Sequence, residues 1–245
     1  MTGLLASLLG FGVIFITSAL MLGMSWFRRE SPPVFRDIPA YTRLRRAIGR
    51  VVEDGTRLHV SLGRGALTSP QSAPALSGLT LLHRLAELTS AGDRPPIATS
   101  GDSALTILSQ DTLQATAQGT YDPTAGRLTG LTPFSYAAGA AMAIHDENIS
   151  TNVLMGNFGV ESALLTDAGE RAGTFTLAAS DNLTAQAVIY ASAQEPLIGE
   201  ELYAVGAYTD AGRFHISSLI VQDILRWMII IIIVVGSLLK LTGFL

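Results

Sequence analysis

Two glycines, in Gly63-Arg-Gly65, directly follow a run that is typical of a β-strand, Arg57-Leu-His-Val-Ser-Leu. Glycine at such a turn lets backbone amides approach a phosphate, and the amino terminus of a following helix favours an anion. The full dinucleotide fingerprint Gly-x-Gly-x-x-Gly is absent, because residue 68 is Thr, and Pro70 and Pro74 delay the next helix. The pattern therefore favours ordinary turn glycines, with a nucleotide-binding loop as the alternative.

A second polar turn, Thr99-Ser-Gly-Asp102, ends another predicted strand and begins a helix, and Asp181-Asn182 holds a similar position later in the chain. Ligands of open α/β sheets bind at the carboxyl ends of strands. Capping of the following helices, at about 1 kcal/mol each, is sufficient to explain Asp102 and Asp181 and is the favoured interpretation. The candidate cofactor-binding residues are Gly63, Gly65, Ser100, Gly101 and Asp102.

Other reactive side chains form no recognisable catalytic group. His145-Asp-Glu-Asn148 places four possible metal ligands in a row, but neighbours on a helix point about 100° apart and do not converge. No Gly-x-Ser-x-Gly elbow surrounds a serine. Lys240 is the sole lysine and cysteine is absent, which excludes a P-loop, a lysine Schiff base and thiolate chemistry in the central region. We expect no catalytic residue, no metal and no cofactor, and an enzyme is the less favoured class.

The elements that position these residues alternate between short β-like runs and helix-like stretches. Such alternation is typical of βαβ units with a mainly parallel sheet. We therefore predict a Rossmann-like α/β fold, with helices on both faces of the sheet. Residues 182–193 fit either a helix or a strand. The predicted strands lie near residues 57–62, 96–99, 128–134, 152–155 and 174–178, and the predicted helices near 41–54, 76–89, 103–118, 136–145, 160–171 and 196–208.

The predicted helix at 41–54 is amphipathic. Tyr41, Leu44 and Ile48 form an apolar stripe, and arginines at 43, 46 and 50 occupy the other face. Gly55 is suited to end this helix in the left-handed conformation.

Apolar segments at both ends of the chain predict membrane helices. Residues 3–26 hold no charged side chain, and the second segment, roughly 219–245, is built around Trp227 and the isoleucines that follow it. A hydrocarbon core needs about 20 apolar residues of helix. We predict a transmembrane helix at 1–27, a juxtamembrane linker with the basic amphipathic helix at 28–55, the α/β domain at 56–212 and a second transmembrane helix at 213–245.

Arginines follow the first apolar segment, at positions 28, 29, 36, 43, 45, 46 and 50, and none precedes it. By the positive-inside rule the central domain is cytoplasmic and both termini lie outside, in a two-pass protein of the cell (inner) membrane. The same asymmetry argues against a cleaved signal peptide. Arg28, Arg29 and Arg226 are expected to contact lipid headgroups. With a net charge of −4 and no other basic surface, nucleic acid is not an expected partner.

Small residues recur four positions apart in the first apolar segment, which is typical of closely packed membrane helices. The alternative is that glycine and alanine are simply common in such helices. The expected seam consists of Gly3, Ala6, Ser7, Gly10, Ala19 and Gly23.

The chain resembles an uncharacterised bacterial family of two-pass membrane proteins with a Rossmann-like cytoplasmic domain. Five stretches carry the resemblance: residues 59–63 (HVSLG), 99–102 (TSGD), 109–112 (SQDT), 180–183 (SDNL) and 195–201 (EPLIGEE). The resemblance implies topology and fold class, and it brings no activity and no catalytic residue.

These observations favour a membrane-anchored scaffolding protein, whose α/β domain mediates homo-oligomeric or larger complex assembly. The bilayer and other copies of the chain are the expected partners. A domain that binds a nucleotide or small ligand at the carboxyl ends of the strands is the alternative.

Overall fold

The computed structural model describes residues 2–27, 35–69, 72–90, 92, 94–117, 119 and 121–242. Contacts divide the chain into two compact units, one formed by Met1–Arg36 with Gly212–Leu245 and the other by Asp37–Ala211. The second unit carries the α/β fold and the first carries the two apolar helices.

The α/β unit alternates helices and strands along the chain, as predicted. Its elements are α2 (Pro39–Glu53), β1 (Arg57–Gly63), α3 (Ser72–Thr89), β2 (Ile97–Ser100), α4 (Ser103–Thr116), the 3-10 helix η1 (Pro123–Ala125), β3 (Gly126–Leu128), α5 (Pro133–Asp146), β4 (Ile149–Asn157), α6 (Ser162–Arg171), β5 (Phe175–Ser180), α7 (Leu183–Ser192), β6 (Glu195–Leu197), the 3-10 helix η2 (Gly199–Ala204) and α8 (Val205–Tyr208).

The described strands form one six-stranded sheet in the order β3-β2-β1-β4-β5-β6, and every pair is parallel. Val60 of β1 pairs with Ala98 of β2 on one side and with Val153 of β4 on the other. The strand order reverses between β1 and β4, which is the position where Rossmann-like sheets bind ligands. The predicted fold class is thus confirmed.

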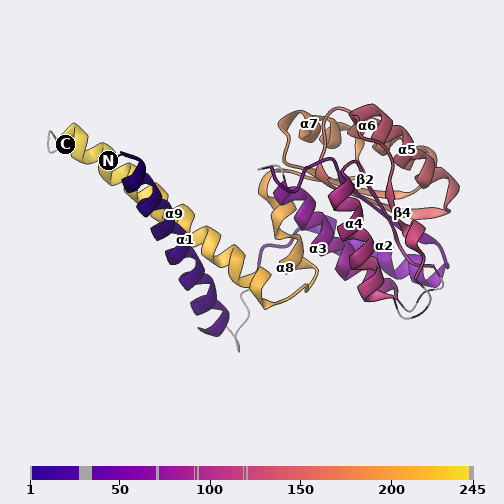
Figure 1. Ribbon diagram of the computed structural model, residues 1–245, viewed down its shortest axis with the longest axis horizontal. Helices are drawn as coiled ribbons and strands as arrows, with labels where there is room; N and C mark the ends of the chain where they lie inside the picture. The colour runs from indigo at the N-terminus through magenta and orange to yellow at the C-terminus, as the bar shows by residue number, and fades with distance from the viewer. Residues whose placement is uncertain are drawn as a thin grey trace. The chain divides into compact units, whose positions relative to one another are not determined.

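Helices cover both faces of the sheet (Figure 1). On one face α2, α3, α4 and α8 pack on alternate strand residues such as Leu58, Val60 and Val153. On the other face α5, α6 and α7 pack on Leu154 and Ala178. Because both faces are covered, the strands are buried almost throughout.

The amphipathic helix predicted at 41–54 is α2, and its apolar stripe is part of the α/β core. Tyr41, Leu44 and Ile48 are buried there, and the Tyr41 hydroxyl donates to the backbone oxygen of Glu201 at 2.7 Å. Gly55, at φ 62°, follows the helix as predicted. By contacts α2 belongs to the α/β unit.

Two predicted elements need correction. The helix expected at 196–208 is wrong at its beginning, because Glu195–Leu197 is strand β6. β6 pairs only with β5, so Pro196 lies in an edge strand, where a missing amide hydrogen is tolerated. Gly199, at φ 67°, then separates β6 from the helical residues. The strand expected at 128–134 is also misplaced, since β3 covers 126–128 and α5 begins at Pro133.

The other unit contains α1 (Thr2–Phe27) and α9 (Arg213–Leu241), which lie side by side with both chain ends at the same end of the pair (Figure 1). Each is long and apolar enough to span a membrane, over Ala6–Trp26 and Phe214–Leu241. Most of their described large apolar side chains are exposed, as expected for helices that face lipid.

Candidate functional site

Parallel strands bring the loops that follow them to one edge of the sheet. We call this edge the carboxyl rim and define it by the residues after each strand, 64–69, 101–102, 129–134, 158–161, 181–183 and 198. All five predicted cofactor-binding residues lie at it or at the adjoining strand ends.

The structure brings the ends of β1 and β2 together, and with them four of these five residues. The Gly101 amide donates to the Gly63 carbonyl at 2.9 Å. The Ser100 hydroxyl donates to the Asp102 carbonyl at 3.0 Å, and Asp102 Oδ1 accepts the Leu105 amide at 3.0 Å. Asp102 is therefore the N-cap of α4, as the capping alternative predicted.

Tyr136 of α5 occupies the space at the end of β1. Its hydroxyl accepts the Gly63 amide at 3.1 Å and also pairs with the Ser61 hydroxyl. The Tyr136 side chain is completely buried, and this burial raises the pKa of its phenol. The Arg64 amide donates to the Asn157 carbonyl at 3.0 Å. The amides of Gly63, Arg64 and Gly101 thus all donate within the protein, and a phosphate would have to displace these contacts.

Residue 63 must be glycine for two reasons. Its φ is 71°, and β1 approaches β4 closely at this position. A Cβ on this residue would lie 2.3 Å from the Asn157 carbonyl oxygen, and one on Gly156 would lie 1.9 Å from the Leu62 oxygen. The crossover point of the sheet is therefore closed by backbone packing.

Carboxylates dominate the charge of the carboxyl rim. Asp181 Oδ1 accepts Asn157 Nδ2 at 2.9 Å, and the buried Glu161 accepts the Gly159 amide through Oε1 at 2.9 Å. The N-cap of α7 is Asn182, whose Oδ1 accepts the Thr184 amide, so the capping role considered for Asp181 is wrong. Negative charge at this edge disfavours anionic ligands.

Large apolar side chains are exposed on four loops of the rim: Leu131 (66% exposed), Phe134 (60%), Val160 (49%), Leu183 (81%) and Ile198 (37%). The described loop residues at the opposite edge of the sheet include no exposed large apolar side chain, although Leu88 and Tyr190 are exposed in the last turns of α3 and α7. Where exposed apolar side chains form a large contiguous patch, they mark sites of protein association. Sequence reasoning missed these residues, because Leu131 and Phe134 lay inside the strand predicted at 128–134 and Val160 and Ile198 lay inside predicted helices.

A polar cluster is buried beneath α5 in the middle of the sheet. His59 lies between Asn152 (Nδ1 to Oδ1, 2.8 Å) and Thr99 (Nε2 to Oγ1, 2.9 Å), and none of the three side chains is exposed. Burial lowers the pKa of His59 to about 4, so the imidazole is neutral at physiological pH. No solvent reaches this cluster, so its hydrogen bonds act only between the strands and hold β1 to β2 and β4.

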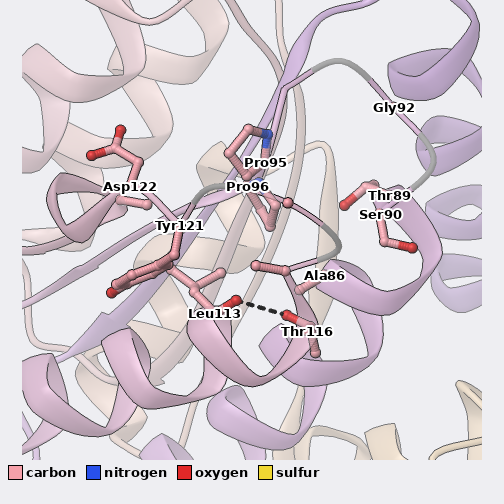
Figure 2. A pocket seen from close by; sticks show the side chains of 13 residues that line it. Ala86, Thr89, Ser90, Gly92, Pro95, Pro96, Leu113, Thr116, Tyr121 and Asp122 are labelled. Atoms are coloured by element: carbon pink, nitrogen blue, oxygen red, sulfur yellow. Dashed lines mark hydrogen bonds between the residues drawn. The ribbon is translucent and has the colours of Figure 1, made fainter.

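At the opposite edge of the sheet a hollow of about 300 Å³ lies between the ends of α3 and α4 (Figure 2). Small and apolar groups form most of its lining, including Ala86, Pro96 and Leu113. Asp122 is its only charged lining residue in the described part of the chain, and this carboxylate accepts the amide and hydroxyl of Thr124. These two hydrogen bonds lower the pKa of Asp122. The lining offers no catalytic group.

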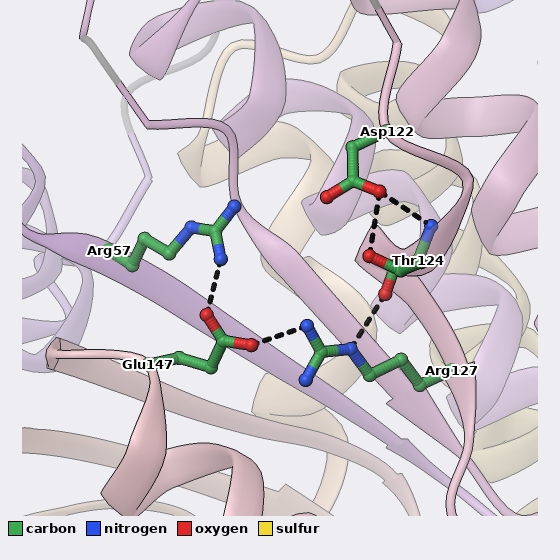
Figure 3. A network of polar contacts seen from close by, with 5 residues as sticks. All are labelled: Arg57, Asp122, Thr124, Arg127 and Glu147. Carbon is green, nitrogen blue, oxygen red and sulfur yellow. Dashed lines mark hydrogen bonds and ion pairs between the residues drawn. The ribbon is translucent and has the colours of Figure 1, made fainter.

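An ion network joins three elements at the same edge (Figure 3). Glu147, after α5, accepts Arg57 of β1 through Oε2 and Arg127 of β3 through Oε1, each at 2.5 Å. The Arg127 Nε also donates to the Thr124 carbonyl at 2.6 Å. The hydrogen bond from Arg127 is the main cause that lowers the pKa of Glu147. This network holds the strand β3 and the end of α5 to the central strand β1.

The predicted membrane residues lie on α1 and α9. Ala6, Ser7, Gly10 and Ala19 of the small-residue seam are exposed, and a Cβ on Gly10 or Gly23 would meet no heavy atom within 4 Å. Gly3 lies in α1, and Arg28 and Arg29 lie outside the described residues. Thr17 and Met21 of α1 instead line a hollow shared with α9. Arg226 Nη1 is 3.6 Å from Asp223 Oδ1. The seam and the headgroup contacts remain predictions.

Within the described residues no group of three or more His, Cys, Asp or Glu side chains could hold a metal ion. Comparison with known proteins shows that no curated protein and no solved structure matches the chain. A family model described as Domain of unknown function (DUF6754) matches residues 5–244. The match covers nearly the whole chain, including both apolar helices, and the chain therefore belongs to this family.

Proposed function

We propose that the protein is a membrane-anchored assembly module. In this proposal α1 and α9 cross the cell membrane as a two-pass anchor, the α/β unit lies in the cytoplasm, and its carboxyl rim joins the chain to other copies of itself or to a larger membrane complex. The observation that carries the proposal is the set of exposed apolar side chains on four loops of one edge of the sheet.

The physical argument is the cost of leaving these side chains in water. Burial of apolar surface is favourable by about 25 cal/mol per Å², so Leu131, Phe134 and Leu183 together favour a covered rim. Interfaces of this type have an apolar centre and a polar margin. Here Asp181 and Glu161 supply polar groups beside the apolar ones.

The topology rests on the distribution of arginines. Seven arginines between residues 28 and 50 follow α1, and the positive-inside rule assigns this side to the cytoplasm. The side-by-side pair of α1 and α9, with both chain ends together, supports two termini on one side of the membrane (Figure 1).

The assembly proposal is tested by the mass of the purified full chain in mild detergent, measured by light scattering. We expect a particle of several chains rather than one of 25.9 kDa. Leu131→Ser with Leu183→Ser should shift the particle toward the monomer. Ile107→Ser with Leu76→Ser is the matched control, because these residues are also exposed but lie on α4 and α3. A monomer at micromolar concentration, or equal effects of the two pairs, would contradict the proposal.

The topology is tested with protease on sealed, right-side-out cells. The α/β unit should stay intact until the membrane is opened, and carbonate washing should leave the chain in the membrane. Digestion in sealed cells would place the unit outside.

A further inference from the structure

The helix α2 exposes a row of arginines on the surface of the α/β unit. Arg43, Arg45, Arg46 and Arg50 are all exposed on its outer face, whereas Tyr41 and the other apolar residues face the core. Most of the apolar face of this amphipathic helix is therefore already occupied. What remains available to another molecule is mainly positive charge, with four arginines against the exposed carboxylate of Glu53.

Two of these arginines are neutralised within the unit and two are not. Arg43 pairs with Glu195, and Arg45 pairs with Asp210 at 3.0 Å. Arg46 and Arg50 form no ion pair with any residue that the structure describes. They lie four positions apart on the helix, where like charges repel each other by a few tenths of a kcal/mol. An external anionic surface would relieve this repulsion.

The covalent connections of α2 limit its distance from the membrane anchors. Asp210, which holds Arg45, lies three residues before Arg213, the first residue of α9. Three residues of extended chain span at most about 11 Å. α9 has 29 residues and is therefore about 44 Å long, which exceeds the hydrocarbon core of about 30 Å, so part of the helix extends beyond the hydrocarbon core of a bilayer.

An apolar hollow of about 520 Å³ adjoins the arginine face. Its lining includes Ile48 and Val52 of α2 and Leu88 of α3. Its charged groups are two arginines, Arg45 and Arg84, and two carboxylates, Glu53 and Asp210. The hollow therefore places apolar surface beside the arginine face but adds no net positive charge to it.

From these observations we infer that the exposed face of α2, with Arg46 and Arg50 at its centre, binds the anionic headgroups of the lipid bilayer to which the chain is anchored. The inference depends on the membrane anchoring in the proposed function, but it does not depend on assembly through the carboxyl rim. Each basic residue near an anionic leaflet contributes binding free energy, and the two arginines together correspond to a roughly 30-fold preference for the membrane-apposed orientation.

The test uses the full chain in liposomes. Because the natural chain has no cysteine, a single Gly49→Cys substitution allows a fluorescent label on the exposed side of α2. A Cβ at Gly49 meets no heavy atom within 4 Å, so the substitution fits. Ala138→Cys on α5, on the opposite face of the sheet, is the matched labelling site. Spin-labelled lipid headgroups quench a label that approaches the membrane surface.

We expect strong quenching at residue 49 in phosphatidylcholine liposomes that contain phosphatidylglycerol, and weak quenching in phosphatidylcholine alone. About 1 M salt, where the Debye length is about 3 Å, should abolish the difference. Arg46→Gln with Arg50→Gln should also abolish it. Arg94→Gln with Arg171→Gln removes the same charge from exposed positions elsewhere and should leave it unchanged.

Equal quenching in the two lipid mixtures, or equal loss in the two double variants, would overturn the inference. Quenching that falls when the protein is diluted in the membrane would overturn it in favour of contact with a second copy. Resistance to carbonate extraction is measured on the same samples. Failure of the anchoring proposal is therefore distinguishable, because it would release every variant from the liposomes.

Discussion

The Nδ1 atom of His59 on β1 lies 2.8 Å from Oδ1 of Asn152 on the neighbouring strand β4, at the centre of the sheet. Because an amide oxygen only accepts, this orientation places the imidazole proton on Nδ1. Nε2 then accepts the hydroxyl of Thr99 on β2, at 2.9 Å. One neutral imidazole thus connects the three central strands.

This arrangement predicts that the α/β unit loses stability in mild acid. Burial lowers the pKa of His59 from 6.5 to about 4, so the unfolded chain binds the proton more readily than the folded one between these values. The contribution of neutral His59 to the free energy of unfolding is fully present above pH 6.5. It is lost as the pH decreases toward 4, by on the order of 3 kcal/mol at most. Urea unfolding of the detergent-solubilised chain, followed by circular dichroism from pH 7.5 to 4.5, measures the effect.

His59→Gln is the control for this titration, since it keeps an amide for hydrogen bonding and removes the ionisable group. Its stability should be lower at pH 7 and should vary less between pH 6.5 and 4.5. An unchanged slope in His59→Gln would show that the imidazole does not titrate in this way.

Gly63→Ala should destabilise the unit far more than an ordinary glycine replacement. Two costs combine here, a φ of 71° and a Cβ that would lie 2.3 Å from the Asn157 carbonyl oxygen. Gly173→Ala is the matched control, because Gly173 has a φ of 68° with no heavy atom near the Cβ position. The control should lose about 1 kcal/mol from the positive φ alone. The free energies of urea unfolding compare the two, and equal losses would contradict close packing of β1 against β4.

Replacement of Glu147 should weaken the attachment of β3. Glu147→Gln leaves Arg57 and Arg127 without their shared carboxylate, and breaking a partly buried pair of this kind costs about 1–3 kcal/mol. The lowered pKa of Glu147 means that its contribution is present above its ordinary value of 4.5 and is lost as the pH falls through its folded pKa. Hydrogen exchange at residues 126–128 provides the measurement.

The control for Glu147 is Asp167→Asn, which breaks the exposed pair between Asp167 and Arg171 on α6. Such an i, i+4 pair contributes about 0.3–0.5 kcal/mol. If both substitutions change hydrogen exchange in β3 to the same small extent, the network at Glu147 does not hold that strand.

Local patterns were sufficient to predict most of the fold. The apolar run at Arg57–Gly63 and the leucine spacing of α3 indicated a strand and a helix, and their alternation predicted a parallel sheet. The prediction failed at Pro196 because its place on an edge strand depends on pairing with β5, which no local pattern reveals. For the same reason the sequence did not show that Tyr136, 73 residues away, would reach the Gly63 amide.

Part of the candidate site could be predicted from the sequence, for a related reason. Gly63, Ser100, Gly101 and Asp102 each end or directly follow a strand, so a parallel sheet brings them to one edge. Leu131 and Leu183 also follow strands and therefore lie at the same edge, but only polar residues were considered there. A search of the predicted strand ends would have missed Leu131, because the strand predicted at 128–134 included it.

Substitution of Asp102 distinguishes a helix cap from a ligand-binding carboxylate. Asp102→Ala removes the acceptor of the Leu105 amide and should cost about 1 kcal/mol. Asp102→Asn should retain nearly full stability, because asparagine is an equally good N-cap. Asn182→Ala, which removes the corresponding cap of α7, should cost a similar amount. Urea unfolding of the three variants measures these losses. A stable Asp102→Ala variant that loses a thermal shift produced by a nucleotide in the natural chain would instead assign Asp102 to a binding site.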